Sequence, residues 1–363
     1  MSAYIIRRLL LMIPTLFAVM LINFLVVQAV PGGPIERILS TLDDTAVSAT
    51  ERISGAGGEI AASPTGSGGK TYRGARGLPP EFIEQLEQQF GFDKPLYERF
   101  GLMMRNFLMF EFGESYFRDR SVTDLVLDKL PVSISLGLWT TILVYLISIP
   151  LGVAKAVRDG SRFDVWTSGI VIVGNAIPGF LFAILLIVVF AGGQYLDWFP
   201  LRGLLSNDWR ELSWPELVVD YLWHITLPVL AMVIGGFAAL TILTKNSFLE
   251  EINKQYVMTA RAKGLTERRV LYGHVFRNAM LIVISGFPAA FIGILFTGSL
   301  LIEVIFSLDG LGLLGFEAAI NRDYPVMLAT LYFFTLLGLV LSLIADLTYV
   351  WVDPRIDFES REV

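Results

Sequence analysis

Long uncharged stretches dominate the pattern of hydrophobic and polar positions along this chain. A helix needs about 20 mostly apolar residues, at about 1.5 Å of rise each, to cross the hydrocarbon layer of a membrane. Six windows without Asp, Glu, Lys or Arg reach that length, namely Leu9–Val30, Pro131–Ala154, Val165–Leu196, Tyr221–Thr244, Ala279–Ile302 and Tyr324–Ala345. The pattern therefore predicts an all-α membrane protein with six transmembrane helices.

The first window has one feature of a secretory signal peptide, because Arg7 and Arg8 precede it. It holds 22 uncharged residues, has no A-x-A-like cleavage site, and is followed by Pro31-Gly32-Gly33-Pro34, which ends a helix. A signal peptide has a shorter apolar region and a small-residue cleavage site. We therefore expect an uncleaved membrane span.

The distribution of Lys and Arg predicts the orientation of the spans. If the N-terminus is inside, the cytoplasmic segments hold fourteen basic residues and the two short outer loops hold three, Arg202, Arg210 and Arg322. The long first outer segment does not count, because long segments cross the membrane whatever their charge. Both termini are expected in the cytoplasm.

The same pattern predicts three parts. These are an N-terminal transmembrane helix (1–30), an outer insertion (31–130) and a five-helix core (131–363). Within the insertion, 40–78 is rich in Gly, Ser, Thr and Ala and is expected to be flexible. Apolar residues at helical spacing predict amphipathic helices from about 79 to 110. This helical part is either a packing cap or a docking or gating surface.

Composition narrows the possible functions. Of 363 residues, 54% are hydrophobic and 17% are charged, and the mean hydropathy is +0.61. The chain has no cysteine, so disulfides and thiolate metal sites are impossible. A net charge of −6 gives no sign of nucleic-acid binding. The two histidines, His224 and His274, are predicted on opposite sides of the membrane, which argues against a zinc site or a histidine base for a nucleophile.

One short motif is misleading. Gly68-Gly69-Lys70-Thr71 resembles the end of a phosphate-binding loop, but the required glycine six residues before the lysine is Pro64. The sequence contains no other such motif. Any ATP hydrolysis must then come from another protein.

The predicted spans carry few charges and many helix-loosening residues. Asp346 near the end of the last span is expected to reach the interface or to pair with a basic residue. No series of acidic residues crosses several spans, which argues against a proton-coupled carrier. The Gly and Pro residues indicate either ordinary close packing or helices that rearrange to open a path. In the second case Asn175, close to Pro178, could line that path.

A basic segment between two apolar windows is the clearest functional feature. Lys245 to Asn278 contains seven basic and three acidic residues. Glu250–Lys263 can form a helix with Ile252, Tyr256, Ala260 and Lys263 along one side, and Gly264 suits the left-handed position that ends it. Thr266 then suits the N-cap of a second helix, Glu267–Arg277. Two short helices around a glycine would form a compact contact for a partner.

Tyr256–Gly264, followed by His274–Ala279, resembles the coupling motif of ABC-importer permeases in its peptide-transporter form. The generic motif begins Glu-Ala-Ala, with Gly four residues after the second Ala. Here Met258 and Thr259 replace the first two residues, whereas Ala260 and Gly264 match. The apolar-Pro ending of the generic motif is missing.

The resemblance to the dipeptide/oligopeptide permease family extends over nearly the whole chain. The matching segments are 31–34, 91–95, 112–115, 130–133, 298–306, 310–312, 322–325 and 353–355. The enlarged insertion at about 40–78, together with 160–166, further resembles the first permease subunit of the Yej-type microcin C/oligopeptide importers.

The resemblance implies a type I permease fold and one of two membrane subunits of a bacterial inner-membrane importer, with 31–130 in the periplasm. The expected partners are a second permease, a cytoplasmic ABC ATPase that receives 250–278, a periplasmic peptide-binding protein and the lipid bilayer, with no nucleic acid. ATP and Mg²⁺ would bind to the ATPase, and this chain would bind no cofactor. The cargo would be oligopeptides, including microcin C-like conjugates.

The implied site residues fall into two groups. The expected ATPase-coupling residues are Tyr256, Ala260, Arg261, Ala262, Lys263 and Gly264. The expected translocation-path residues are Asn175, Pro178 and Glu303. A secondary transporter and a membrane enzyme remain the alternatives; the first would need no ATPase, and the second would need a converging catalytic group that the sequence does not show.

Overall fold

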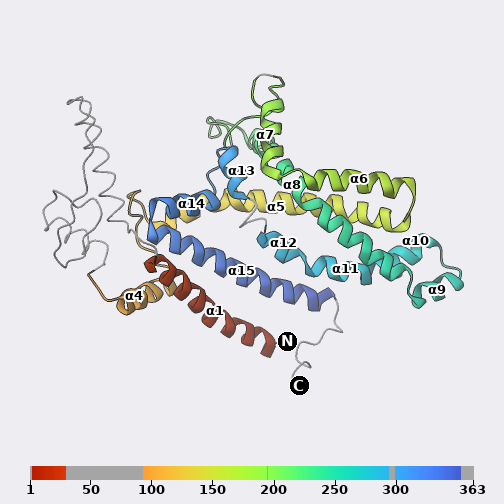
Figure 1. The fold of residues 1–363 in the computed structure, drawn as a ribbon, viewed down its shortest axis with the longest axis horizontal. Helices are drawn as coiled ribbons and strands as arrows, with labels where there is room; N and C mark the ends of the chain where they lie inside the picture. Colours follow the sequence, from red (N-terminus) through yellow and green to blue (C-terminus); the bar gives the residue numbers. More distant parts are fainter. Residues whose placement is uncertain (1, 30–92, 194, 294–298, 353–363) are drawn as a thin grey trace, which may run out of the picture. The chain divides into compact units, whose positions relative to one another are not determined.

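The computed structural model describes residues 2–29, 93–193, 195–293 and 299–352 (Figure 1). These residues form helices and one isolated antiparallel bridge, between Glu114 and Ser121. The expected all-α class is confirmed. The 40–78 insertion and the amphipathic helix expected from 79 lie outside the described residues, except that α4 (Leu96–Leu108) forms where the later part of that stretch was expected.

Four helices are long and apolar enough to cross a membrane, and each contains one of the predicted windows. They are α1 (Ser2–Ala29), α5 (Val122–Val157), α8 (Trp214–Ile252) and α15 (Tyr324–Val352). Prolines lie inside three of them, as Pro14, Pro131, Pro150 and Pro228. Membrane helices tolerate proline because neighbouring groups satisfy the carbonyl oxygens that it leaves unbonded.

The predicted third span, Val165–Leu196, is not one straight helix. It forms α6 (Arg162–Ala176) and α7 (Gly179–Phe190), which meet at an angle of 92°. The cause is Pro178, because proline disfavours helical backbone at the residue before it. Ile177 accordingly has φ −85° and ψ 117°, an extended conformation. Counting this bent pair as one span brings the total to five.

The predicted fifth span, Ala279–Ile302, is also broken. Its described parts are α11 (Phe276–Ser285), α12 (Phe287–Gly293) and α13 (Ser299–Ile305). Gly286 and Pro288 stand at the first break, where glycine and proline weaken a helix. The uncharged window predicted one continuous helix here, and that prediction is wrong at Gly286.

The chain divides into two compact units. Unit 1 contains Met1–Ile13, Leu127–Leu314 and Phe334–Val363, and unit 2 contains Pro14–Val126 and Gly315–Phe333. These boundaries differ from the predicted division at residues 30 and 130, which follows the membrane topology and stays a prediction.

Helix α8 forms the centre of unit 1. It packs against α6, α7 and α11, and its buried residues join one continuous apolar core (Figure 1). Its N-terminus is fixed by the Glu216 carboxylate, which accepts a hydrogen bond from the Ser213 backbone N–H at 2.9 Å. Its other end leads into the basic segment, through the short helices α9 (Gln255–Ala262) and α10 (Glu267–Val270) and the π-helix η1 (Leu271–Val275).

Unit 2 is held by aromatic packing. Phe107 of α4 lies 4.8 Å from Phe112 and 5.5 Å from Tyr332, measured between ring centroids. Beside them the Asp323 carboxylate, which is buried, accepts a hydrogen bond from the Tyr116 backbone N–H at 3.2 Å. These contacts connect α4 and the turn at 113–121 to α15 and to α14 (Leu311–Asn321).

Candidate functional site

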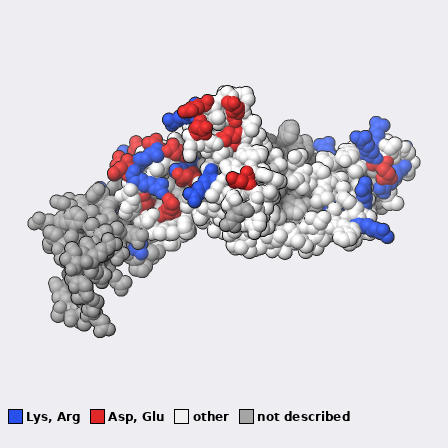
Figure 2. Space-filling model, turned by 90° about the horizontal axis from the view of Figure 1, so that it is seen from above, with Lys and Arg blue, Asp and Glu red and all other residues white. Residues whose placement is uncertain are grey.

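The basic segment lies at one end of unit 1, where Figure 2 shows Lys and Arg side chains gathered over α9 and α10. The exposed basic residues of this surface are Lys254, Arg261, Lys263, Arg268 and Arg269. Two exposed apolar side chains lie among them, Met258 and Tyr272. A cationic surface with apolar side chains is typical of a contact with another protein.

The glycine turn that the sequence predicts is present. Gly264 has φ +78°, and its backbone N–H donates to the Arg261 carbonyl at 2.9 Å. The next N–H, of Leu265, donates to the Ala260 carbonyl at 3.4 Å. These bonds satisfy the carbonyl groups at the end of α9, and only glycine adopts this backbone conformation without strain.

The expected single helix over Glu250–Lys263 is interrupted. Helix α8 ends at Ile252, and Lys254 has an extended ψ of 151° before α9 begins. The second predicted helix, Glu267–Arg277, is helical throughout as α10, η1 and the first turn of α11. Thr266 occupies the expected N-cap position, but its side chain accepts no capping hydrogen bond.

The expected coupling residues divide between two faces of α9. Val257 and Ala260 are buried in the core of unit 1, and Tyr256 is half-buried against it. Ala260 therefore lets α9 approach the chain's own core, and its role in coupling stays a prediction. Arg261, Ala262, Lys263 and Gly264 are exposed.

Sequence reasoning missed Met258 as part of the exposed face. Its side chain is 64% exposed, and it lies one helical turn before Ala262 on α9. The spacing of four residues from Ala262 was a usable signal, because positions i and i+4 share a helix face. The outward face is thus Met258, Ala262 and Lys263, followed by the turn at Gly264.

Ion pairs close the turn between the short helices. The Arg261 guanidinium donates to both carboxylate oxygens of Glu267, from Nε at 2.9 Å and from Nη2 at 3.0 Å. On the inner side, the Tyr256 hydroxyl donates to Glu251 at 2.6 Å. Burial, and then the bond to this carboxylate, raise the pKa of Tyr256. A hydrogen bond to Glu251 likewise raises the pKa of Lys254, so both groups stay protonated at neutral pH.

The segment is firmly attached to two membrane helices. The Ser247 hydroxyl of α8 donates to the Ala279 carbonyl of α11 at 2.6 Å. Phe248 packs edge-on against Phe276 at 5.7 Å, and Val270 and Val275 are buried beside them. A displacement of the segment would therefore reach α8 and α11 directly.

A buried charge cluster, not predicted from the sequence, joins α5, α6 and α8. The Lys155 ammonium lies 3.0 Å from Asp164 Oδ1 and also donates to the hydroxyls of Thr167 and Ser168, at 3.0 and 2.7 Å. The Lys245 ammonium lies 2.7 Å from Asp164 Oδ2 and 2.8 Å from Asp159. Asp164 thus serves two cations from helices far apart in the sequence.

The three expected path residues differ in burial. Asn175 and Pro178 are exposed at the bend between α6 and α7. Glu303 is fully buried in α13, and its carboxylate accepts bonds from the Ser133 hydroxyl at 3.2 Å and the Leu313 backbone N–H at 2.7 Å. Through these bonds Glu303 of α13 is held to α5 and to α14, and its assignment to the translocation path stays a prediction.

The remaining candidate groups have structural partners. Asp346 lies 2.6 Å from Arg8 Nη2, so the expected pairing with a basic residue is confirmed. His224 is buried and its Nδ1 lies 2.8 Å from the Asp220 carbonyl, whereas His274 is exposed. Among the described residues, no group of three or more His, Cys, Asp or Glu could hold a metal ion.

Similarity to known proteins shows the family of this chain. The family described as "Binding-protein-dependent transport system inner membrane component" matches residues 148–358. The chain is 61% identical over its whole length to the full-length "Peptidoglycan transport system permease protein YejB" of Agrobacterium fabrum. It is 59% identical to the "Inner membrane ABC transporter permease protein YejB" of Escherichia coli O157:H7, over 99% of this chain and all of that protein.

A more distant relative also matches over nearly the whole chain. The "Oligopeptide transport system permease protein AppB" of Bacillus subtilis is 34% identical over 99% of this chain and all of that protein. Among solved structures, a chain of the inward-facing MetNI methionine ABC transporter superposes with a TM-score of 0.50 at 17% identity, over 63% of this chain and 97% of that one. This likeness shows the fold alone, the type I permease fold.

Proposed function

Because this chain belongs to the binding-protein-dependent transport system inner membrane component family, as a permease of an ABC importer, we propose that it moves peptides across the membrane and receives the force for this from an ATPase at α9 and α10. The chain is a membrane permease and not an enzyme, and ATP is hydrolysed by a separate subunit. ATP and Mg²⁺ would therefore bind to that subunit and not to this chain.

The peptide cargo is supported by the relatives. AppB carries oligopeptide transport in its name, and the relative from Agrobacterium fabrum carries peptidoglycan transport. Oligopeptides, including microcin C-like conjugates, are the first candidate cargo. Peptide-bearing fragments of peptidoglycan are the second, and the 61% identity to that relative favours them.

The coupling proposal is supported by the two faces of α9, one of which is buried and the other exposed. Its inner face is fixed to the core by Val257 and Ala260, and its outer face presents Met258, Ala262 and Lys263. A partner that pushed on the outer face would move α8 and α11 through the buried contacts of Phe248 and Ser247. In this proposal Tyr256 and Ala260 transmit the movement, and Arg261 to Gly264 receive it.

The proposed assembly has four kinds of component. A second related permease completes the translocation path, an ABC ATPase binds α9 and α10, and a periplasmic peptide-binding protein docks on the opposite face. Both termini lie in the cytoplasm in this arrangement, as the basic residues predict. Asn175 and Pro178, exposed at the 92° bend, are proposed to border the path once the second permease is present.

Gly264→Val tests the coupling proposal. A valine at φ +78° costs the turn about 1–2 kcal/mol and alters the end of α9. In proteoliposomes containing the complete transporter and its binding protein, ATP-driven uptake of a labelled peptide should fall at least tenfold while membrane insertion stays normal. Uptake at the normal rate would show that the turn plays no part in coupling.

Gly193→Val is the matched control. Gly193 has φ +68° and, like Gly264, has no atom within 4 Å of the position that a Cβ would take, but it follows α7 and lies far from α9 in the sequence. Its backbone cost is therefore similar, and it should leave uptake within about twofold of normal. Equal loss in both variants would assign the effect to general destabilisation.

The same vesicles identify the cargo class and exclude the alternative. Unlabelled oligopeptides, muropeptides and microcin C-like conjugates are added in turn as competitors of uptake. Competition by peptides or muropeptides supports the proposal, and the stronger competitor names the cargo. Uptake that persists without ATP but requires an ion gradient would instead indicate a secondary transporter.

A further inference from the structure

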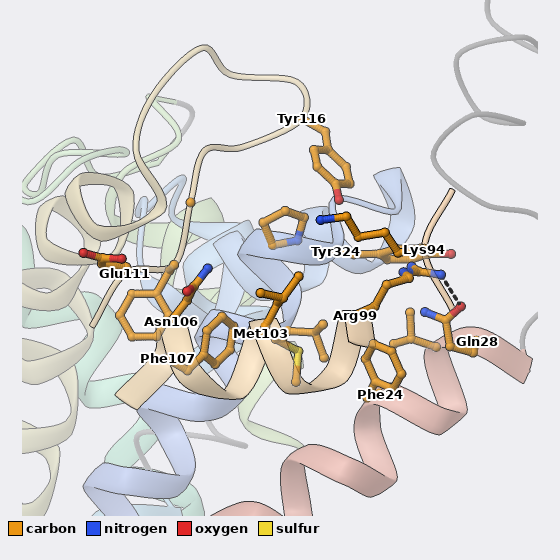
Figure 3. A pocket seen from close by; sticks show the side chains of 16 residues that line it. Phe24, Gln28, Lys94, Arg99, Met103, Asn106, Phe107, Glu111, Tyr116 and Tyr324 are labelled. Atoms are coloured by element: carbon orange, nitrogen blue, oxygen red, sulfur yellow. Dashed lines mark hydrogen bonds between the residues drawn. The ribbon is translucent and has the colours of Figure 1, made fainter. Parts of the chain in front are cut away.

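Unit 2 contains a cavity of about 300 Å³ (Figure 3). It lies between the end of α1, the helix α4, the turn after Glu111 and the start of α15. All of its lining residues belong to unit 2.

One part of the cavity is polar and basic. Lys94, Arg99, Tyr116, Tyr324 and Gln28 converge there in Figure 3, and Arg99 Nη1 donates to Gln28 Oε1 at 3.3 Å. A guanidinium carries five N–H donors, so Arg99 can bind an anion while it keeps other partners, Gln28 among them. Burial raises the pKa of Tyr116 to about 12 although the Arg99 charge opposes this, so its hydroxyl remains a donor at neutral pH.

The rest of the lining is mostly apolar. Phe24 and Val27 of α1, Met103 and Phe107 of α4, and Leu328 of α15 form it. The Arg99 guanidinium lies 5.9 Å from the centre of the Phe24 ring, which places the cation directly beside the apolar part. Among the described lining residues Glu111 is the one carboxylate, and in Figure 3 it lies beside Asn106, away from Lys94 and Arg99.

The order of these side chains along the helices matches a membrane interface. The apolar stretch that begins in α1 ends at Val30 in the sequence, and that of α15 begins at Tyr324. Gln28 and Tyr324 therefore stand at the headgroup level, while Phe24 and Leu328 lie one helical turn deeper on the hydrocarbon side. Helix α4 has the composition of an interfacial helix, with Tyr97 and Leu108 exposed although apolar or aromatic.

From this arrangement we propose that the cavity binds a phospholipid of the adjacent leaflet, with its phosphate on Lys94 and Arg99 and an acyl chain along Phe24, Met103 and Leu328. A phosphate accepts strong charge-assisted hydrogen bonds from guanidinium and ammonium groups. The apolar lining continues from the basic end toward the membrane interior, which is the direction in which a lipid already lies. A soluble peptide would gain nothing from that alignment.

The test uses the full-length chain purified in its transporter complex and native mass spectrometry with added phosphatidylglycerol. Arg99→Gln should weaken phosphatidylglycerol binding about tenfold, the loss of one charge-assisted contact. Arg105→Gln is the matched control, since Arg105 lies on the same helix, is exposed and does not line the cavity. It should leave binding within about twofold of normal.

Three further arms separate the possible sources of the ligand. Diacylglycerol, which lacks the phosphate, should bind at least tenfold more weakly than phosphatidylglycerol, and glycerol 3-phosphate should fail to displace the lipid. Displacement by glycerol 3-phosphate or by a peptide at equal concentration would overturn the proposal and assign the cavity to a soluble anion. Equal losses in Arg99→Gln and Arg105→Gln would also overturn it.

A second variant keeps the test decisive if Arg99→Gln does not assemble. Met103→Trp fills the apolar part of the cavity and leaves every charge in place. It should weaken phosphatidylglycerol binding at least fivefold, and unchanged binding would contradict the proposed position of the acyl chain.

Discussion

Two ion-pair sites in unit 1 have nearly the same contact distance and opposite surroundings. Lys155 lies 3.0 Å from Asp164, with side chains that are 2% and 8% exposed. Arg261 lies 2.9 Å from Glu267, with side chains that are 42% and 74% exposed. The contact distance therefore does not distinguish the two pairs, whereas their burial does.

This difference in burial separates a pair that fixes the packing of the helices from a pair on a surface that a partner can contact. Removing one member of a buried pair leaves an uncompensated charge in a medium that solvates it poorly, whereas water and salt replace most of an exposed pair. The Lys155–Asp164–Lys245 cluster accordingly fixes how α5, α6 and α8 pack. The Arg261–Glu267 pair can open without unfolding the chain, which suits a surface that meets a moving partner.

The largest effect is expected for Asp164→Ala. It leaves the ammonium groups of Lys155 and Lys245 without their shared carboxylate, and breaking a buried pair in this way costs about 3–5 kcal/mol. Unfolding of the purified chain in detergent, followed by circular dichroism during titration with sodium dodecyl sulfate, measures the loss.

Asp159→Ala is the control for this variant. Asp159 also pairs with Lys245, at 2.8 Å, but its side chain is 52% exposed. Its removal should cost at most about 1 kcal/mol. If the two variants are equally stable, burial does not set the strength of these pairs and the comparison fails.

The sequence could predict the exposed site but not the buried one, and the reason is physical. The turn at Gly264 and the helices beside it depend on residues within ten positions, so the sequence contains the information locally. Asp164 meets Lys245 across 81 positions, and nothing near either residue indicates this partner. Prediction from the sequence is also limited at the exposed site. The small size of Ala260 did not indicate whether its side chain faces a partner or the core.

A second loss of stability is expected where the buried Glu303 carboxylate accepts hydrogen bonds from neutral donors. A Cβ on Gly310 would lie 2.5 Å from the Glu303 carboxylate carbon, in a region where both oxygens accept hydrogen bonds. Gly310→Ala must therefore displace Glu303 or the backbone, and overpacking of this kind costs about 1–3 kcal/mol. The same denaturant titration measures it.

Gly235→Ala provides the comparison for Gly310→Ala. A Cβ at Gly235, inside α8, would meet no atom within 4 Å, and alanine favours a helix over glycine. This variant should be as stable as the original chain or more so. A destabilised Gly235→Ala, or an unaffected Gly310→Ala, would show that the contact with Glu303 does not constrain this region.

The fold shows the same division between local and distant information. The uncharged windows located four of the spans. In the third predicted span, the sequence has Pro178 at the position where the helix bends by 92°. The size of the bend was not predictable, because it depends on how α7 packs against α8 and α13. Glu303 was assigned to the path since a carboxylate in a membrane segment usually has a function. Its hydrogen bond from Ser133, 170 positions away, was not predictable from the sequence near either residue, and its place in the path stays a prediction.

The smallest effect on stability is expected at the exposed pair, where it separates stability from function. In a double-mutant cycle of Arg261→Ala and Glu267→Ala, the coupling energy should be about 0.2–1 kcal/mol and should shrink as salt is added.

If the ATPase binds Arg261, ATP-driven uptake in proteoliposomes should fall at least fivefold in Arg261→Ala and less than twofold in Glu267→Ala. The two variants lose the same intramolecular pair, so an equal fall in uptake would mean that the pair itself matters and that Arg261 contacts no partner. A coupling energy as large as that of a buried pair would show that the exposed pair Arg261–Glu267 and the buried pair Lys155–Asp164 do not differ in strength.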